Sequence, residues 1–131
     1  RGWEAAEGAL LPPEFIANYL DNPGFHHDWI GVWAVVGQTV VGSGGFRRSP
    51  MDGMVEIGYG VAPSYEGRGV ASILCAALVH HAFTHGAEKV IAHTLPTGYA
   101  SQRVLAKNGF TFVDEHMDPE DGLVWRYERV R

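Results

Sequence analysis

A glycine-rich turn at residues 66–71 leads directly into a predicted helix, and its residue types suit the binding of a phosphate group. Gly67 and Gly69 permit backbone conformations that are closed to other residues. Successive N–H groups are then exposed at the positive end of the helix dipole, where an anion is stabilised. A P-loop would need a longer spacer and a lysine, and a dinucleotide fold would need a βαβ unit, so both are disfavoured. A tight turn that only starts the helix stays open as an alternative.

The strand predicted immediately before this turn, Met54 to Ala62, has two very different faces. Alternation places Glu56, Gly58 and Gly60 on one face. The other face carries four large side chains: Val55, Ile57, Tyr59 and Val61. Two glycines on one face leave nothing to pack there, which is typical of a bulge or of the close approach of a ligand or another backbone. The sequence therefore places a bare strand surface directly before the candidate phosphate site.

The remaining patterns predict the elements that would position this turn. Prolines followed by an apolar run predict a short helix over residues 13–20. Turn residues between β-branched runs predict a hairpin from Trp29 to Phe46, and the strand after it completes an antiparallel meander. The rest of the chain is predicted as helix, strand, helix, strand and strand, over residues 70–84, 89–94, 100–108, 110–114 and 124–130.

The long helix is predicted to be amphipathic. Apolar residues recur at helical spacing at Val70, Ile73, Leu74, Ala77 and Leu78. Cys75 falls among them and is expected to be a packed residue rather than a nucleophile. His81 and His85 could present two ring nitrogens to a metal, but no acidic partner completes the set, so a role at the helix end is favoured and no metal is expected.

Three motifs in order resemble the GNAT (GCN5-related N-acetyltransferase) superfamily, within it the ribosomal-protein-alanine N-acetyltransferase branch. The first is the Glu-Ile-Gly-Tyr stretch at residues 56–59, and the second is the glycine-rich turn. The third, residues 100–110, is similar to the serine-bearing helix and Gly-Phe strand start of that branch. The resemblance covers most of residues 29–130. Its functional implication is the transfer of an acetyl group from acetyl-CoA, as co-substrate, to a primary amine.

The resemblance also implies a fold and a cofactor site. The fold is α+β, with a mixed central sheet that includes the meander, helices on both faces, and strands at residues 54–62 and 89–94 that splay apart to form the CoA cleft. Residues 1–131 would form a single acetyltransferase domain that lacks the family's N-terminal strand. The pantetheine arm would pair with backbone around Tyr59, Gly60 and Val61. The pyrophosphate would be held by backbone amides and by the Arg68 side chain. The residues that supply the amides are Gly67, Arg68, Gly69, Val70 and Ala71.

For catalysis, the resemblance implies a direct attack of the amine on the thioester, without a metal. The Val61 N–H would stabilise the oxyanion, and most of the acceleration would come from holding the reactants together. Glu56 is the predicted base, with a sheet-face salt bridge as the alternative. Ser101 is predicted to assist the leaving sulfur, with a helix-surface hydroxyl as the alternative. His93 could be a second base or a packed strand histidine.

Three departures from the family pattern favour a second hypothesis, a non-catalytic acyl-CoA-binding or sensor module of the same fold. Glu66 stands where the turn usually begins with Gln or Arg, Gly98 replaces an Asn, and Leu105 replaces a Tyr that serves as acid. An acidic run at residues 114–121 is expected to be a solvated hairpin loop or an anionic rim that attracts a cationic amine.

Composition limits the partners and the compartment. Ten Lys and Arg against fifteen Asp and Glu give a formal charge of −5, which disfavours nucleic acid. No stretch is long and apolar enough to span a membrane, and one cysteine cannot form an internal disulfide, so a cytoplasmic location is expected. A homodimer is plausible because a sheet edge is free. The acceptor amine is expected to be a peptide N-terminus or a small molecule.

Overall fold

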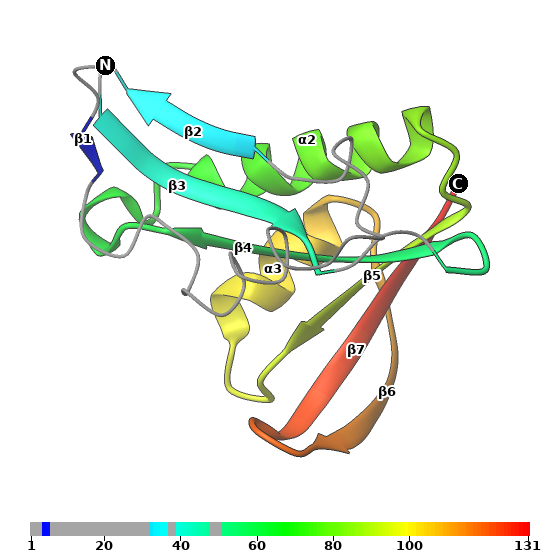
Figure 1. Ribbon diagram of the computed structural model, residues 1–131. Coiled ribbons are helices and arrows are strands. Elements are labelled where there is room, and N and C mark those ends of the chain that lie inside the picture. The colour runs from blue at the N-terminus through cyan, green and yellow to red at the C-terminus, as the bar shows by residue number, and fades with distance from the viewer. Residues whose placement is uncertain (1–3, 6–31, 37–38, 48–50) are drawn as a thin grey trace.

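A mixed β-sheet with two α-helices on one side of it makes up the part of the chain that the computed structural model describes, residues 4–5, 32–36, 39–47 and 51–131 (Figure 1). A single turn of 3-10 helix, Pro63–Tyr65, lies between the fourth strand and the first of these helices. The elements are β1 Glu4–Ala5, β2 Val32–Val36, β3 Thr39–Phe46, β4 Met54–Val61, α2 Val70–Thr84, β5 Lys89–Thr94, α3 Tyr99–Lys107, β6 Thr111–Asp118 and β7 Gly122–Val130.

The strand order is β1-β3-β4-β5-β7-β6, with β2 also paired to β3. β2, β3 and β4 are antiparallel neighbours, as the predicted meander requires. β4 and β5 are parallel, but their pairing stops at Glu56 and Ile91. Beyond this point the two strands diverge, as Figure 1 shows. The predicted splay of these strands, and with it the mixed α+β sheet, is therefore confirmed.

The core lies between the sheet and α2. Leu78 and Cys75 of α2 pack with Val55, Ile57 and Phe46 of the strands. Two glycines of β3 allow α2 to come close. A Cβ on Gly44 would lie 2.7 Å from Leu78 Cδ1, and one on Gly42 would lie 3.1 Å from Leu74 Cδ1. Because Gly44 is paired with Tyr59, the helices cover the Tyr59 face of β4 and not the face of Glu56.

The buried stripe of α2 differs from the predicted one. The structure buries Leu74, Cys75, Leu78, Val79 and Ala82, whereas Ile73 is 67% exposed. Leu74 and Leu78 are buried as predicted. The buried face, however, extends to Cys75 and Val79, each one residue further along the chain, instead of to Ile73. Each residue advances about 100° around a helix axis, so this small rotation is enough to expose Ile73.

Other predicted elements differ in extent. The strand expected at residues 110–114 continues to Asp118, so much of the acidic run lies on β6 rather than in a loop. Asp118 then accepts hydrogen bonds from the N–H groups of Glu120 and Asp121 and closes a tight turn into β7. Both described helices pack on one face, since α2 contacts α3 as well as the sheet. The predicted helix over residues 13–20, and any helix it would add to the second face, lies outside the described residues.

Candidate active site

A cavity of about 690 Å³ lies where β4, the start of α2 and α3 meet. Its walls bring together three segments that are separated in sequence. Its lining residues are Tyr59, Gly60, Val61, Tyr65, Glu66, Gly67, Gly69, Val70, Ala71, Ser72, Ala100, Ser101, Arg103, Val104 and Lys107. Most residues that the sequence analysis assigned to a cofactor therefore surround one cavity.

The glycine-rich turn adopts the conformation that its composition predicted. Gly67 and Gly69 have φ of 78° and 83°, and an added Cβ would meet nothing within 4 Å at either position, so backbone conformation rather than space favours glycine there. The N–H of Ile73 donates to the Gly69 carbonyl, which begins the α2 ladder. The N–H groups of the first helical turn, at Val70 and Ala71, therefore have no acceptor within the helix. They border the cavity.

Among the described residues, no strand pairs with the backbone groups of β4 at the edge that faces the cavity. Glu56 O accepts from Arg47 N at 2.9 Å, and Ala62 N donates to Val41 O at 2.9 Å, so even-numbered residues of β4 point their backbone groups toward β3. Alternation then directs the N–H and C=O groups of Tyr59 and Val61 toward the opposite edge. That edge has lost β5 as a partner beyond Glu56. An extended ligand could add to it as an extra strand.

Cations border the cavity from α3 rather than from the glycine-rich turn. The Arg68 guanidinium, which was expected to contact the phosphate, lies 5.0 Å from the centre of the Tyr65 ring and is not among the residues that line the cavity. Arg103 and Lys107, four residues apart on α3, line it instead. Neither residue was predicted as a site residue from the sequence, although their i, i+4 spacing on a predicted helix places both on one helix face. Glu66 also lines the cavity and is exposed.

Two hydroxyl groups lie together on the cavity wall. Burial raises the pKa of the Tyr59 hydroxyl well above its ordinary value, and the neighbouring Ser101 hydroxyl only partly opposes this effect. Tyr59 is therefore protonated throughout the physiological range. Its oxygen is buried and lacks a good hydrogen-bond partner among the described residues, Ser101 included. Buried polar atoms are nearly always partnered, so this oxygen marks a place where a ligand or water can bind.

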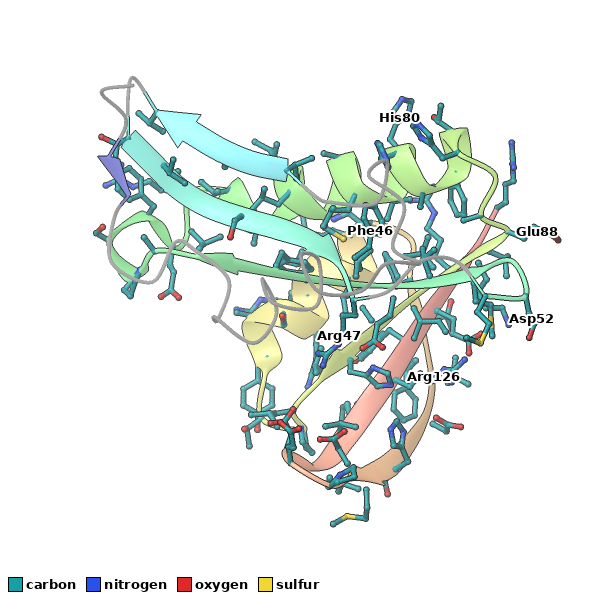
Figure 2. All side chains as sticks on the ribbon, in the orientation of Figure 1. Phe46, Arg47, Asp52, His80, Glu88 and Arg126 are labelled. Carbon is teal, nitrogen blue, oxygen red and sulfur yellow. The ribbon has the colours of Figure 1, made fainter. Side chains whose placement is uncertain are left out.

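Glu56 lies on the other face of the sheet and does not line the cavity, although it was expected on the ligand side. Its side chain is 12% exposed, and Oε2 lies 2.8 Å from His93 Nδ1 and 3.7 Å from Arg47 Nε. Figure 2 shows Arg47 at the end of β3, where the chain leaves the sheet. Glu56 is also the last residue of β4 that pairs with β5. Its carboxylate therefore lies beside the position where β4 and β5 separate.

Charged groups surround Glu56 and His93 on this face. Arg126 of β7 is paired with His93, and its Nη2 lies 2.8 Å from Glu128 Oε2. Burial opposes the ionisation of Glu128, but the hydrogen bond from Lys89 and the charge of Arg126 outweigh it and hold the pKa of Glu128 below its ordinary value. The His116 and His93 rings are nearly perpendicular, with 5.0 Å between their centres. This face of the sheet therefore holds acidic and basic side chains in ion pairs, next to the imidazole rings of His93 and His116.

The positions that depart from the family pattern have clear structural surroundings. Leu105 is 1% exposed within the core and does not reach the cavity. Gly98 is the N-cap residue of α3, and a Cβ there would lie 3.2 Å from the Leu95 carbonyl oxygen, so a larger residue would require a small shift of this loop. Cys75 is fully buried, and burial raises its thiol pKa to about 12, as expected of a packed residue.

Neither a metal site nor a membrane span is found in the described part of the chain. No group of three or more His, Cys, Asp or Glu side chains is arranged to hold a metal among these residues. His85 Nδ1 instead lies 2.9 Å from the His81 carbonyl oxygen at the end of α2. No described helix is long and apolar enough to cross a membrane.

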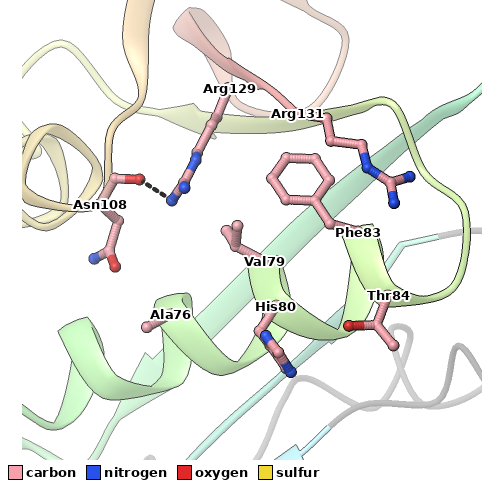
Figure 3. Close-up of a pocket in the computed structure, with 8 residues that line it drawn as sticks. All are labelled: Ala76, Val79, His80, Phe83, Thr84, Asn108, Arg129 and Arg131. Carbon is pink, nitrogen blue, oxygen red and sulfur yellow. Dashed lines mark hydrogen bonds between the residues drawn. The ribbon is translucent and has the colours of Figure 1, made fainter.

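A second, smaller cavity of about 310 Å³ lies beside the C-terminal half of α2 (Figure 3). Arg129 extends into it and donates from Nη1 to the Asn108 carbonyl oxygen at 2.6 Å. The same guanidinium lies 5.7 Å from the centre of the Phe83 ring. These contacts tie the last strand to both helices, so Arg129 has a structural role there.

Comparison with known proteins identifies similar sequences and similar structures. The acetyltransferase Pat of Mycolicibacterium smegmatis is 27% identical over 109 residues, which are 83% of this chain and 32% of that protein. The chain thus spans about a third of the length of this curated relative. The ribosomal-protein-S5-alanine acetyltransferase of Vibrio fischeri has a TM-score of 0.66 at 16% identity, over 71% of this chain and 55% of that chain.

A third similar protein was solved with a cofactor. The aminoglycoside acetyltransferase AAC(6')-Ib, in complex with coenzyme A, has a TM-score of 0.66 at 20% identity, over 76% of this chain and 64% of that chain. The family model of the acetyltransferase (GNAT) domain matches residues 6–111, which include β4, the glycine-rich turn and both described helices. This match extends over most of the sequence, and the chain belongs to the GNAT acetyltransferase family.

Proposed function

We propose that residues 1–131 act as one acetyltransferase domain, which moves an acetyl group from acetyl-CoA to a primary amine. The observation that carries this proposal is the cavity of about 690 Å³ that joins the glycine-rich turn to the unpaired edge of β4. An elongated ligand with a phosphate at one end and an amide-containing arm at the other matches both parts. Acetyl-CoA has this form, and coenzyme A is bound in one of the solved structures described above.

The cofactor would lie along the cavity with its pyrophosphate at the start of α2. Backbone N–H groups of residues 67–71 would hold this group, and Arg103 and Lys107 of α3, which line the cavity, would add positive charge. The pantetheine arm would pair with the free backbone groups of Tyr59 and Val61. The thioester would then reach the point where β4 and β5 separate.

At that point the reaction needs an oxyanion donor, a proton acceptor and a proton donor. The Val61 N–H, which faces the open edge of β4, is the proposed donor to the oxyanion. Glu56 and its hydrogen-bonded partner His93 lie where β4 and β5 separate, and this pair would supply the proton acceptor. On the cofactor side, the hydroxyls of Ser101 and Tyr59 would donate to the departing sulfur, since both lie on the cavity wall and Tyr59 is protonated. Tyr59 would thus serve in place of the tyrosine absent at Leu105.

The proposed acceptor is a peptide α-amine or a small cationic amine. The relatives are named for acetylation of a ribosomal protein and of aminoglycosides, both of which offer amines. On this chain, β6 and its turn carry five acidic residues that would attract a cation. They are Asp114, Glu115, Asp118, Glu120 and Asp121. A cytoplasmic location is part of the same proposal, because Cys75 is a free thiol.

The test is release of the CoA thiol from acetyl-CoA in the presence of a peptide with a free N-terminal alanine, a lysine peptide with a blocked N-terminus, and kanamycin. Time-dependent thiol release with at least one of these amines, and the matching mass increase of the acceptor, is expected. Glu56→Gln should lower the rate while leaving CoA affinity unchanged, because Glu56 does not line the cavity. Binding of CoA without transfer to any amine would favour the sensor hypothesis, for which the buried Leu105 is the motivating observation.

A further inference from the structure

Glu56 and His93 form a hydrogen-bonded pair at the mouth of the splay. Glu56 Oε2 lies 2.8 Å from His93 Nδ1, although the residues are 37 positions apart in sequence. The parallel register of β4 and β5 brings them together, since Glu56 pairs with Ile91 and His93 follows two residues later on the same face. His93 thus lies on the diverging part of β5.

The other ring nitrogen of His93 is unsatisfied. His93 Nε2 is buried and has no hydrogen-bond partner among the described residues. A carboxylate accepts hydrogen bonds and cannot donate them, so the short contact requires the proton of a neutral His93 to be on Nδ1. Nε2 then carries the lone pair. A carboxylate that fixes a histidine in this tautomer prepares the opposite nitrogen to accept a proton.

We propose that His93, rather than Glu56, accepts the proton of the acceptor amine, and that Glu56 is a positioning residue that orients His93 and stabilises its protonated form. This inference rests on the proposed acetyl transfer. One proton of the ammonium group passes to Nε2, directly or through one water. The neutral amine attacks the thioester carbon, so the C–N bond forms and the C–S bond breaks. The second proton lost by nitrogen ends on the sulfur as the CoA thiol, and imidazolium returns its proton to solvent.

The surroundings of His93 contain ionisable groups on every neighbouring strand. These groups are Arg47 after β3, Glu56 on β4, Lys89 on β5, Arg126 and Glu128 on β7, and Asp114 and His116 on β6. Glu128 forms ion pairs with Lys89 and Arg126. Of the acidic groups, Glu56 is the one in direct contact with the His93 ring among the described residues. Glu56 is therefore the acidic side chain whose removal tests the orientation of the His93 ring most directly.

A first experiment tests the arrangement without any need for turnover. Nitrogen-15 NMR of the imidazole rings distinguishes the two neutral tautomers in the full chain. We expect neutral His93 as the Nδ1–H form in the wild type, and a mixture of tautomers in Glu56→Ala. A wild-type His93 with its proton on Nε2 would overturn the inference, because that nitrogen could not accept a proton.

A second experiment separates the base from its positioning residue by kcat, KM and pH profile. His93→Asn keeps a donor near the Nδ1 position but removes Nε2, and it should lower kcat by about 10²- to 10⁴-fold, the usual contribution of a general base. The same substitution should also abolish the fall of kcat at acidic pH, which is the acidic limb of the pH profile of kcat. Glu56→Gln should give a smaller loss and move that limb to lower pH, since the imidazolium loses its counter-charge. His80→Asn, an exposed histidine of α2 outside this site, is the matched control.

The outcomes distinguish this inference from the function on which it rests. Wild-type transfer that persists in His93→Asn, with its acidic limb intact, would overturn the role of His93 and leave the acetyltransferase proposal standing. A wild type that transfers nothing overturns both. Unchanged CoA affinity in all three variants, measured by calorimetry, is expected and would show that lost turnover does not arise from a damaged cavity.

Discussion

Two glycines at opposite ends of α2 allow a controlled test of the phosphate site. Gly69 precedes the helix with φ of 83°, and Gly86 follows it with φ of 97°. An added Cβ would meet no atom within 4 Å at either position. Alanine at each site therefore carries the same kind of penalty, about 1–2 kcal/mol of unfolding free energy for a left-handed backbone. Gly69→Ala and Gly86→Ala should lower stability by similar amounts in urea unfolding.

Their effects on CoA binding should differ greatly. In Gly69→Ala the strained turn is expected to relax, which moves the amides of the first helical turn away from the pyrophosphate. A hydrogen bond to a charged group contributes about 1.5–3 kcal/mol. Loss of one such bond would weaken CoA binding by about 10- to 150-fold. Gly86 lies at the far end of α2, outside the residues that line the large cavity, so Gly86→Ala should leave the affinity unchanged.

The assay is calorimetric titration of CoA into each variant at one temperature and one salt concentration, below the onset of unfolding for both. The parallel loss of stability removes general destabilisation as an explanation of any difference. Equal CoA affinities for Gly69→Ala and Gly86→Ala would refute the assignment of the pyrophosphate to the glycine-rich turn.

Three further predictions concern α2, α3 and the core. Gly44→Ala should lower the free energy of unfolding by about 1–3 kcal/mol, because the added Cβ would overlap Leu78 Cδ1. Chemical denaturation measures this change, and an unchanged midpoint would contradict the close packing of α2 on β3. Arg103→Gln with Lys107→Gln should weaken CoA binding and reduce its salt dependence, whereas Arg68→Gln should change neither in the same titration. Cys75, with a thiol pKa of about 12, should resist iodoacetamide at pH 8 until urea unfolds the chain; rapid labelling of native protein would contradict its burial.

Much of the cofactor side could be predicted because its determinants are local in sequence. The turn at residues 66–71 directly joins β4 to α2, so the glycines, the strand edge and the helix start are necessarily neighbours. The bounds of β5 and the approximate bounds of α2 and α3 followed from periodicity and capping signals in the same way.

The acceptor side depends on long-range packing, which a single sequence does not specify. Alternation alone showed that Glu56 shares a face with Gly58 and Gly60. It could not show that α2 covers the opposite face, which depends on the close approach of Leu78 to Gly44. The contact between Glu56 and His93 depends on the parallel register of two strands separated by a helix. Likewise, the orientation of Arg103 toward the cavity depends on how α3 is rotated against its neighbours.

The most direct test of the account is calorimetric titration of acetyl-CoA into the wild-type chain at a fixed salt concentration. The cavity beside the glycine-rich turn predicts one site per chain with micromolar affinity, about −8 kcal/mol, and strong weakening in Gly69→Ala. Absence of detectable binding by a folded wild-type protein would contradict the central claim that this cavity holds the acetyl donor.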